Sequence, residues 1–304
     1  MKNKSVEFNV EVNDIITPSS CSSMVIEFIK YIIYQKQLIP YNYERLKMYV
    51  PRGQTLVDSM KDSDQGDRSF RSKHFVVLDK YLHKTRDAYN SLEKIFHLIN
   101  EELTSTGSDR VEEIVIMLGT SFLNPQEVFR IRIPSLNYSH LDKHHSTRKN
   151  CRNLFRSMIN SEQFYDLISS NCTGNLHVML KMKPDHSLNS NSFILRNGFR
   201  LPTKGKQAVI TFQETHHNPQ SCSCFEIKIY EDDSTSDSLP LSQSSDCSTT
   251  TDVSSCCSDT NSSSNPNGSW YQVKDTLRYF SDVKIDGTSV TDIWMNPTLL
   301  NSGK

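Results

Sequence analysis

Long apolar runs are missing from this sequence. No stretch approaches the roughly 18 consecutive apolar residues that a membrane-spanning helix needs, so an integral membrane protein is not expected. The first residues alternate apolar and polar side chains and contain no continuous apolar stretch typical of a secretory signal. The sequence therefore predicts a soluble, intracellular protein.

A strong net charge and a disulfide framework are also absent. The formal net charge of -1 excludes a broadly basic nucleic-acid coat protein. The eight cysteines are scattered or lie in serine-rich sequence, without the spacing of a disulfide scaffold. With 304 residues, the chain is long enough for one large domain.

Catalytic signatures are missing too, and we predict no enzyme and no cofactor. The sequence contains no nucleophile elbow, no His-Glu-x-x-His pair and no kinase signature set. Residues 198–206 resemble a phosphate-binding loop, but six residues separate Gly198 from Gly205 instead of four. Gln207 also stands where a magnesium-binding Ser or Thr is required. A basic hairpin turn is the favoured interpretation.

A histidine pair near two cysteines suggests a metal site, but the spacing does not support it. His216, His217, Cys222 and Cys224 lack the usual cysteine spacing and a second ligand pair, so a surface turn is favoured over zinc. The pair formed by His144 and His145 precedes a predicted helix and is interpreted as a solvated loop.

One segment, 231–268, differs sharply from the rest of the chain. It holds seven acidic residues, no lysine or arginine, and almost no side chain that could fill a core. Such a composition predicts disorder. Without it the remaining chain carries about +6 by formal charge. Strand-like sequence on both sides predicts an insertion within one domain at 21–300, preceded by a short N-terminal tail at 1–20.

Apolar periodicity predicts a mixed fold. Apolar residues at helical spacing predict three helices, at 24–38, 74–103 and 146–168. Pro40 is expected to end the first helix, Pro51 to end a short amphipathic piece, and 52–71 to form a mobile loop. Strands are predicted at 114–118, 128–133, 176–182, 192–201, 207–212, 225–230, 270–273 and 277–285. The order predicts an α+β domain with three helices packed on one face of a mainly antiparallel sheet.

Several blocks, taken in order, resemble one protein family. The blocks are 24–50, which includes the run Tyr34-Gln35-Lys36-Gln37, then 110–119, 124–129, 151–156, 193–212 and, more faintly, 270–287. Together they resemble the comet family of HORMA-like adapters, which bind the spindle-checkpoint protein Mad-two. The long acidic insertion departs from the family pattern.

The resemblance implies a HORMA-like fold and a non-enzymatic adapter. Such an adapter binds the closed conformer of the Mad-two HORMA protein and presents it to a hexameric AAA+ ATPase for remodelling. The spindle assembly checkpoint is thereby silenced in mitosis. The expected location is the nucleus and cytoplasm, with spindle and kinetochore association in mitosis. No membrane and no direct nucleic-acid partner is expected.

The third predicted helix carries most of the expected partner-binding residues. Its apolar residues cover more of the circumference than one core stripe requires, and an aromatic residue flanked by arginines is typical of an interface anchor. The expected partner-binding residues are Gln35, Arg152, Phe155, Arg156 and Met158. Phe155 as plain core and Gln35 as a solvated helix end remain the alternatives.

Another function class is also open. A HORMA-type protein of meiotic chromosomes or a DNA polymerase accessory complex would share the fold. The basic residues of the third helix could contact phosphates, but no aromatic platform or binding motif accompanies them.

Overall fold

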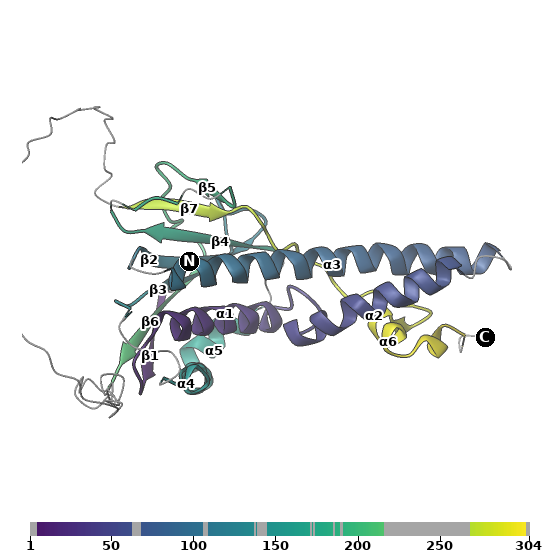
Figure 1. Cartoon of the computed structure of the whole chain (residues 1–304), viewed down its shortest axis with the longest axis horizontal. Coiled ribbons are helices and arrows are strands. Elements are labelled where there is room, and N and C mark those ends of the chain that lie inside the picture. The colour runs from purple at the N-terminus through teal and green to yellow at the C-terminus, as the bar shows by residue number, and fades with distance from the viewer. Residues whose placement is uncertain are drawn as a thin grey trace, which may run out of the picture.

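A seven-stranded, mainly antiparallel sheet forms the centre of the computed structural model, which describes residues 5–62, 68–105, 109–136, 138, 145–170, 172, 174–184, 186–188, 191–215 and 268–301. Its strands are β1 (Ser5–Val12), β2 (Val111–Gly119), β3 (Glu127–Arg132), β4 (Asn175–Met182), β5 (Phe193–Leu195), β6 (Lys206–Glu214) and β7 (Ser269–Val273). Their order is β1-β6-β3-β2-β4-β7-β5 (Figure 1). Only β1/β6 and β3/β6 are parallel pairs.

The central strand β2 is buried on both faces, as its continuous apolar run predicts. Ile114, Ile116 and Leu118 join the main core, whereas Val115 and Met117 join a smaller cluster. Because side chains alternate along a strand, these two sets lie on opposite faces of the sheet. The side chains packed against the smaller cluster are Phe122, Phe199, Leu201 and Trp270.

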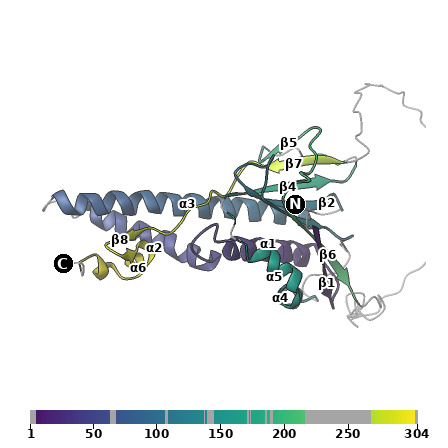
Figure 2. The ribbon, with the colours of Figure 1, turned by 180° about the vertical axis from the view of Figure 1, so that it is seen from behind.

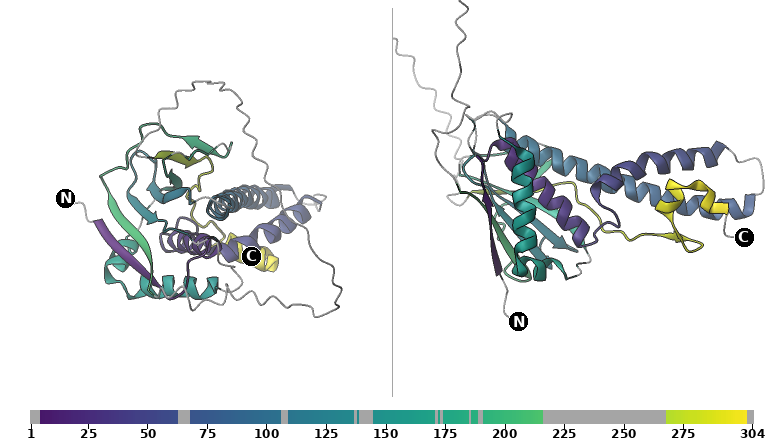
Figure 3. Two further views of the ribbon diagram at one scale, coloured as in Figure 1. Left: turned by 60° about the vertical axis from the view of Figure 1, so that its left-hand side comes forward. Right: turned by 90° about the horizontal axis from the view of Figure 1, so that it is seen from below.

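Helices lie against the face of the sheet that carries the main core, opposite the smaller cluster (Figure 3). The described residues contain α1 (Pro18–Gln35), α2 (Tyr43–Asp62), α3 (Arg68–Thr104), α4 (Thr147–Asn160), α5 (Glu162–Ile168) and α6 (Val290–Met295), followed by a 3₁₀ turn at Pro297–Asn301. Helix α1 packs against α3 and against α4, and α4 also packs against β1. The three predicted helices correspond to α1, α3 and the α4–α5 pair.

The predicted loop at 52–71 is wrong over 52–62 and 68–71, which are helical, whereas 63–67 lie outside the described residues. Helix α2 continues through Pro51 to Asp62, and α3 begins at Arg68, so the two helices form a hairpin that extends beyond the sheet (Figure 1). A proline inside a helix removes one backbone hydrogen bond and disfavours the helix locally. Packing outweighs this cost here, because Trp294 of α6 lies against the rings of Tyr49 and Tyr81.

The expected N-terminal tail at 1–20 also needs correction. Residues Ser5–Val12 form β1, whose buried side chains alternate with exposed ones, and Pro18 already begins α1. Strand β1 pairs in parallel with β6, about 200 residues later in the chain. Thr17 caps α1 by accepting a hydrogen bond from the backbone N–H of Ser20.

Other predicted boundaries change as well. The helix predicted at 146–168 is interrupted at Ser161, which has extended backbone angles and caps α5 through a hydrogen bond from the backbone N–H of Phe164. The strand predicted at 192–201 shortens to β5. The strand predicted at 277–285 is replaced by a single bridge at Leu277 and a small hairpin of β8 (Lys284–Ile285) and β9 (Thr288–Ser289). The strand predicted at 225–230 lies outside the described residues.

The last strand described before the acidic insertion and the first strand after it meet at the same end of the sheet. Strands β6, β3 and β4 run in one direction and β2 and β7 in the other, so β6 ends where β7 begins. Three strands separate β6 from β7 in the sheet. Of the segment 231–268, the structure describes only Gly268.

Candidate protein-interaction surface

The expected partner-binding residues come from two helices that pack side by side, α1 and α4. Gln35 is exposed and is the last residue of α1, whereas Arg152 and Arg156 are exposed on α4. Neither arginine has an ion-pair partner among the described residues. Phe155 lies between the two arginines in sequence and is half-buried. The structure thus brings all five expected residues to neighbouring helices, and four of them are exposed or half-buried.

Phe155 connects the two helices. Its ring centroid lies 5.9 Å from that of Tyr31 in α1, with the planes tilted by 60°. Tyr31 is four residues before Gln35, and residues at this spacing share a face of a helix. The aromatic contact therefore places Phe155 on the side of α4 that borders the Gln35 face of α1.

Met158 is a correction to the expected site. Its exposed fraction is 1%, and it belongs to the main core together with Leu154. Leu154 and Met158 are four residues apart and lie on the same inward face of α4. Met158 is therefore unavailable to a partner while α4 is packed in place.

Ile159 is the residue that sequence reasoning missed. Its exposed fraction is 73%, the highest among the large apolar side chains described. It follows Arg152 and Arg156 on the outward side of α4, at spacings of seven and three residues. The signal was present in the sequence, because Ile159 is the outermost member of an apolar arc wider than one core stripe. Tyr34, half-exposed beside Gln35, adds a second apolar group.

We use the name α1–α4 surface for the exposed and half-buried residues Tyr34, Gln35, Arg152, Phe155, Arg156 and Ile159. It combines aromatic and aliphatic groups with arginines, the composition that protein interfaces favour at their energetic centre. A binding partner would bury the apolar groups and place acceptors opposite the two arginines. The chemistry available is recognition of a protein surface.

The N-terminal end of α4 is anchored to the turn between β1 and α1. Nδ1 of His145 lies 2.8 Å from Oδ1 of Asp14, and the backbone N–H of Ser146 donates to Oδ2 of Asp14. Ser146 itself caps α4 by accepting from the backbone N–H of Lys149. His145 is buried, so the predicted solvated loop is wrong at this residue, whereas His144 lies outside the described residues.

These contacts lower the pKa of Asp14. Burial on its own would raise its pKa, but hydrogen bonds from His145, Ile15 and Ser146 favour the carboxylate and together lower the pKa below the ordinary value. The carboxylate is thus favoured in the folded state. It holds the start of the helix that carries the arginines.

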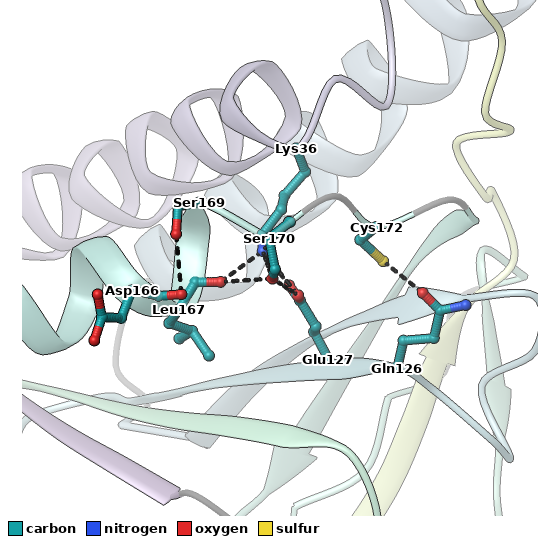
Figure 4. Close-up of polar contacts among 8 residues, drawn as sticks. All are labelled: Lys36, Gln126, Glu127, Asp166, Leu167, Ser169, Ser170 and Cys172. Atoms are coloured by element: carbon teal, nitrogen blue, oxygen red, sulfur yellow. Dashed lines mark hydrogen bonds and ion pairs between the residues drawn. The ribbon is translucent and has the colours of Figure 1, made fainter.

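The end of α1 is anchored by a buried lysine (Figure 4). Nζ of Lys36 lies 2.8 and 2.6 Å from the two carboxylate oxygens of Glu127 at the start of β3. The same ammonium group donates to the carbonyl oxygens of Leu167 and Ser170 and to the Ser170 hydroxyl oxygen. This network joins α1, β3 and the end of α5 directly beside Gln35.

Burial lowers the pKa of Lys36, although the hydrogen bond and charge of Glu127 act in the opposite direction. The Ser170 hydroxyl also donates to Glu127, at 2.8 Å. Every N–H of the ammonium group therefore has an acceptor nearby. The burial of this charge is accounted for by the structural contacts that it makes. The contact is not evident from the sequence, because Lys36 stands in a polar run at a helix end.

The segment 198–206 is not a phosphate-binding loop. It leads into strand β6, whereas such a loop opens a helix. It is also no hairpin turn, because β5 and β6 do not pair and four strands lie between them. Gly205 has a φ of +95°, and a Cβ there would lie 2.7 Å from the carbonyl oxygen of Gln126, so glycine is required.

Other chemistry finds little support in the described part of the chain. No group of three or more His, Cys, Asp or Glu side chains there could hold a metal ion. The proposed zinc alternative, His216, His217, Cys222 and Cys224, lies outside the described residues. Among the described helices, none combines the length and apolar character needed to cross a membrane.

Known proteins share this sequence pattern. The sequence model of the p31comet family, described as Mad1 and Cdc20-bound-Mad2 binding, matches residues 6–229. MAD2L1-binding protein of Homo sapiens is 22% identical over 196 residues, which cover 64% of this chain and 66% of that protein. MAD2L1-binding protein of Mus musculus is also 22% identical over 196 residues, covering 64% of this chain and 65% of the relative. The match thus spans just under two thirds of each relative.

Proposed function

This chain belongs to the p31comet family, and from that membership we propose that it binds Mad2, the checkpoint protein Mad-two, in its Cdc20-bound, closed form. Both relatives are named MAD2L1-binding protein, which supports the same partner. We propose further that the fold is HORMA-like, supported by the mainly antiparallel sheet with helices against one face.

The α1–α4 surface is the binding surface in this proposal. The observation that carries it is Phe155, a half-buried aromatic residue flanked by two exposed arginines without ion-pair partners in the described structure. Its contact with Tyr31 holds the ring in place, so little side-chain freedom is lost on binding. Ile159 extends the apolar area beside it.

The direct test is titration of closed Mad2, loaded with a Cdc20 peptide, against Phe155→Ala. Loss of an aromatic anchor should weaken binding by about 2 kcal/mol, or about 30-fold in Kd. The matched control is Tyr279→Ala, which removes an exposed aromatic ring outside α1 and α4. Equal affinity of wild type and Phe155→Ala would remove α4 from the proposed interface.

Gln35 belongs to the same surface in this proposal. Gln35→Ala should weaken Mad2 binding, and its effect should not add to that of Phe155→Ala, because residues in one patch couple. A double-mutant cycle measures this coupling. Strict additivity would place the two residues in separate contacts.

A further part of the proposal is that this protein is a non-enzymatic adapter for a hexameric AAA+ ATPase. It would present closed Mad2 to the ATPase, which converts Mad2 to its open form and silences the spindle assembly checkpoint. Because closed Mad2 would already be bound to this protein, binding of this protein to the ATPase would raise the effective concentration of Mad2 at the ATPase. Its expected location is the nucleus and cytoplasm, with spindle or kinetochore association in mitosis, which microscopy of tagged protein can check.

The adapter role is tested by remodelling kinetics at matched ATPase concentration. This protein alone should hydrolyse no ATP but should accelerate conversion of closed Mad2. Reversing the charge of Arg152 and Arg156 together should suppress the acceleration, more strongly at low salt, because exposed charges mainly steer association. Equal rates with and without the protein would leave Mad2 binding intact and overturn the adapter role.

A further inference from the structure

A groove runs between α3 and the segment that follows β7. Its volume is about 680 Å³, and one wall is formed by α3 residues between Lys84 and Lys94. The other wall is the segment 274–280, which Figure 2 shows passing α3 on its way from β7 toward α6. We call this the α3 groove.

The two walls run in opposite directions. Asp275 pairs with Lys94 at 3.2 Å, whereas Phe280 packs on Tyr81, at a ring-centroid distance of 5.8 Å. Positions 84 and 94 are about 15 Å apart along the helix, from a rise of 1.5 Å per residue. An extended peptide of about five residues covers that distance.

The wall at 274–280 is fixed to the sheet, so the groove exists before any ligand arrives. Leu277 exchanges two backbone hydrogen bonds with Leu176 of β4, at 2.9 and 3.2 Å. The backbone N–H of Phe280 donates to the carbonyl oxygen of Leu38, and that of Tyr279 donates to Oδ1 of Asn175. A preformed site spends little free energy on ordering when a ligand binds.

Cations lie at both ends of the α3 groove. Lys94 and Lys274 line one end, and Lys84 and Arg278 line the other. Lys84, Lys274 and Arg278 are exposed and have no ion-pair partner among the residues that the structure describes. Between the ends, the lining includes the small buried side chain of Ala88.

Two acidic residues in the lining decide which kind of anion fits. Asp87 is exposed on α3, and Asp275 is half-buried on the opposite wall. A nucleic-acid backbone carries an evenly spaced row of charges and would meet both carboxylates. A peptide can place its acidic side chains at the two cationic ends and neutral residues between them. The aromatic ring of Tyr279, at 43% exposed, offers an apolar contact at the rim.

We infer that the α3 groove is a second protein-interaction surface that binds an extended acidic segment of a partner protein. The groove is lined by α3 and the segment 274–280, whereas the α1–α4 surface is formed by residues of α1 and α4. The two surfaces share no residue. This inference stands on the groove itself and does not depend on Mad2 binding.

The test uses the full chain and a fluorescein-labelled peptide in which Asp pairs flank about five neutral residues, including one Leu. Fluorescence anisotropy should show saturable binding that weakens as KCl is raised. The same peptide with Asn in place of Asp should not bind. A single-stranded oligonucleotide of equal charge should bind at least about tenfold more weakly than the acidic peptide.

Two variants with equal charge change locate the binding. Lys84→Glu combined with Arg278→Glu should weaken peptide binding at least about tenfold. Arg152→Glu combined with Arg156→Glu should leave it within about twofold, although it impairs the proposed Mad2 surface. All four side chains are exposed, and circular dichroism checks that both variants are folded.

The milder variant Lys84→Gln with Arg278→Gln should show a smaller loss in the same direction. Equal losses in the groove and α4 variants would reduce the effect to general charge attraction and overturn the inference. Absence of saturable peptide binding, or tighter binding of the oligonucleotide, would overturn it as well. Loss of Mad2 binding in the α4 variant alone would leave it unaffected.

Discussion

Lys36 and Glu127 form a buried ion pair that joins the last turn of α1 to the first residue of β3. Their side chains are 0% and 4% exposed, and the ammonium nitrogen lies within 2.8 Å of both carboxylate oxygens. Gln35, the neighbouring residue, is exposed on the proposed binding surface. A buried structural contact therefore determines where that side chain is presented.

Lys36→Met should lower the free energy of unfolding by about 3–5 kcal/mol, because it leaves Glu127 buried without its partner. Urea denaturation at neutral pH measures the loss. Replacing Glu127 with Leu in the same chain should recover part of it, since no unpaired charge then remains. A double variant no more stable than the single one would contradict this explanation.

Met158 and Ile159 are neighbours in sequence with opposite environments. Met158→Ala should lower the free energy of unfolding by about 2–4 kcal/mol, because it leaves a cavity in the core. Ile159→Ala should change it by less than about 0.5 kcal/mol, because that side chain is already in water. Mad2 binding should respond in the reverse order when both variants are measured well below their melting temperatures. A stability loss from Ile159→Ala as large as that from Met158→Ala would refute the assignment of the two faces.

Asp14→Asn should destabilise the protein at neutral pH by about 1 kcal/mol, since charged hydrogen bonds to the start of α4 are lost. The pKa of Asp14 is lower in the folded chain than its ordinary value of 3.8, because hydrogen bonds outweigh burial. Its stabilisation is therefore present above that ordinary value and disappears as the pH falls through the folded-state pKa. Wild type and variant should converge as the pH is lowered below about 4.

Urea denaturation across this pH range provides the measurement. Asp58→Asn serves as the control, because the Asp58 side chain is 53% exposed and should show little difference at any pH. A constant difference between wild type and Asp14→Asn at all pH values would show that ionisation of Asp14 is not the cause.

Deletion of 232–267 should leave the melting temperature and Mad2 binding nearly unchanged. The end of β6 and the start of β7 lie at the same end of the sheet, about 19 Å apart at four strand spacings. Residues 216–231 remain in the variant, and their extended length exceeds that distance. Closing a shorter loop costs slightly less entropy. A large fall in melting temperature would mean that the deleted residues pack against the domain.

Local sequence patterns predicted the elements that depend on nearby residues. The central strand β2 and helices α1 and α3 follow from apolar periodicity, which is a property of neighbouring residues. The part of helix α2 after Pro51 was missed because a proline is locally unfavourable inside a helix. Its packing against α3 and α6 is a long-range effect that a local pattern does not contain.

For the proposed binding surface too, some features followed from local sequence and others only from the tertiary structure. The sequence alone was sufficient to identify α4 as a helix with too wide an apolar arc and to pick out Phe155 between two arginines. The position of β1 and α1 against that helix assigned Met158 to the core and left Ile159 exposed. Lys36 belongs to a polar run, and its partners Glu127 and Ser170 are 91 and 134 residues away. Contacts over such distances arise only when the sheet and helices assemble, because burial depends on which elements meet and not on the residues next to each other in the chain.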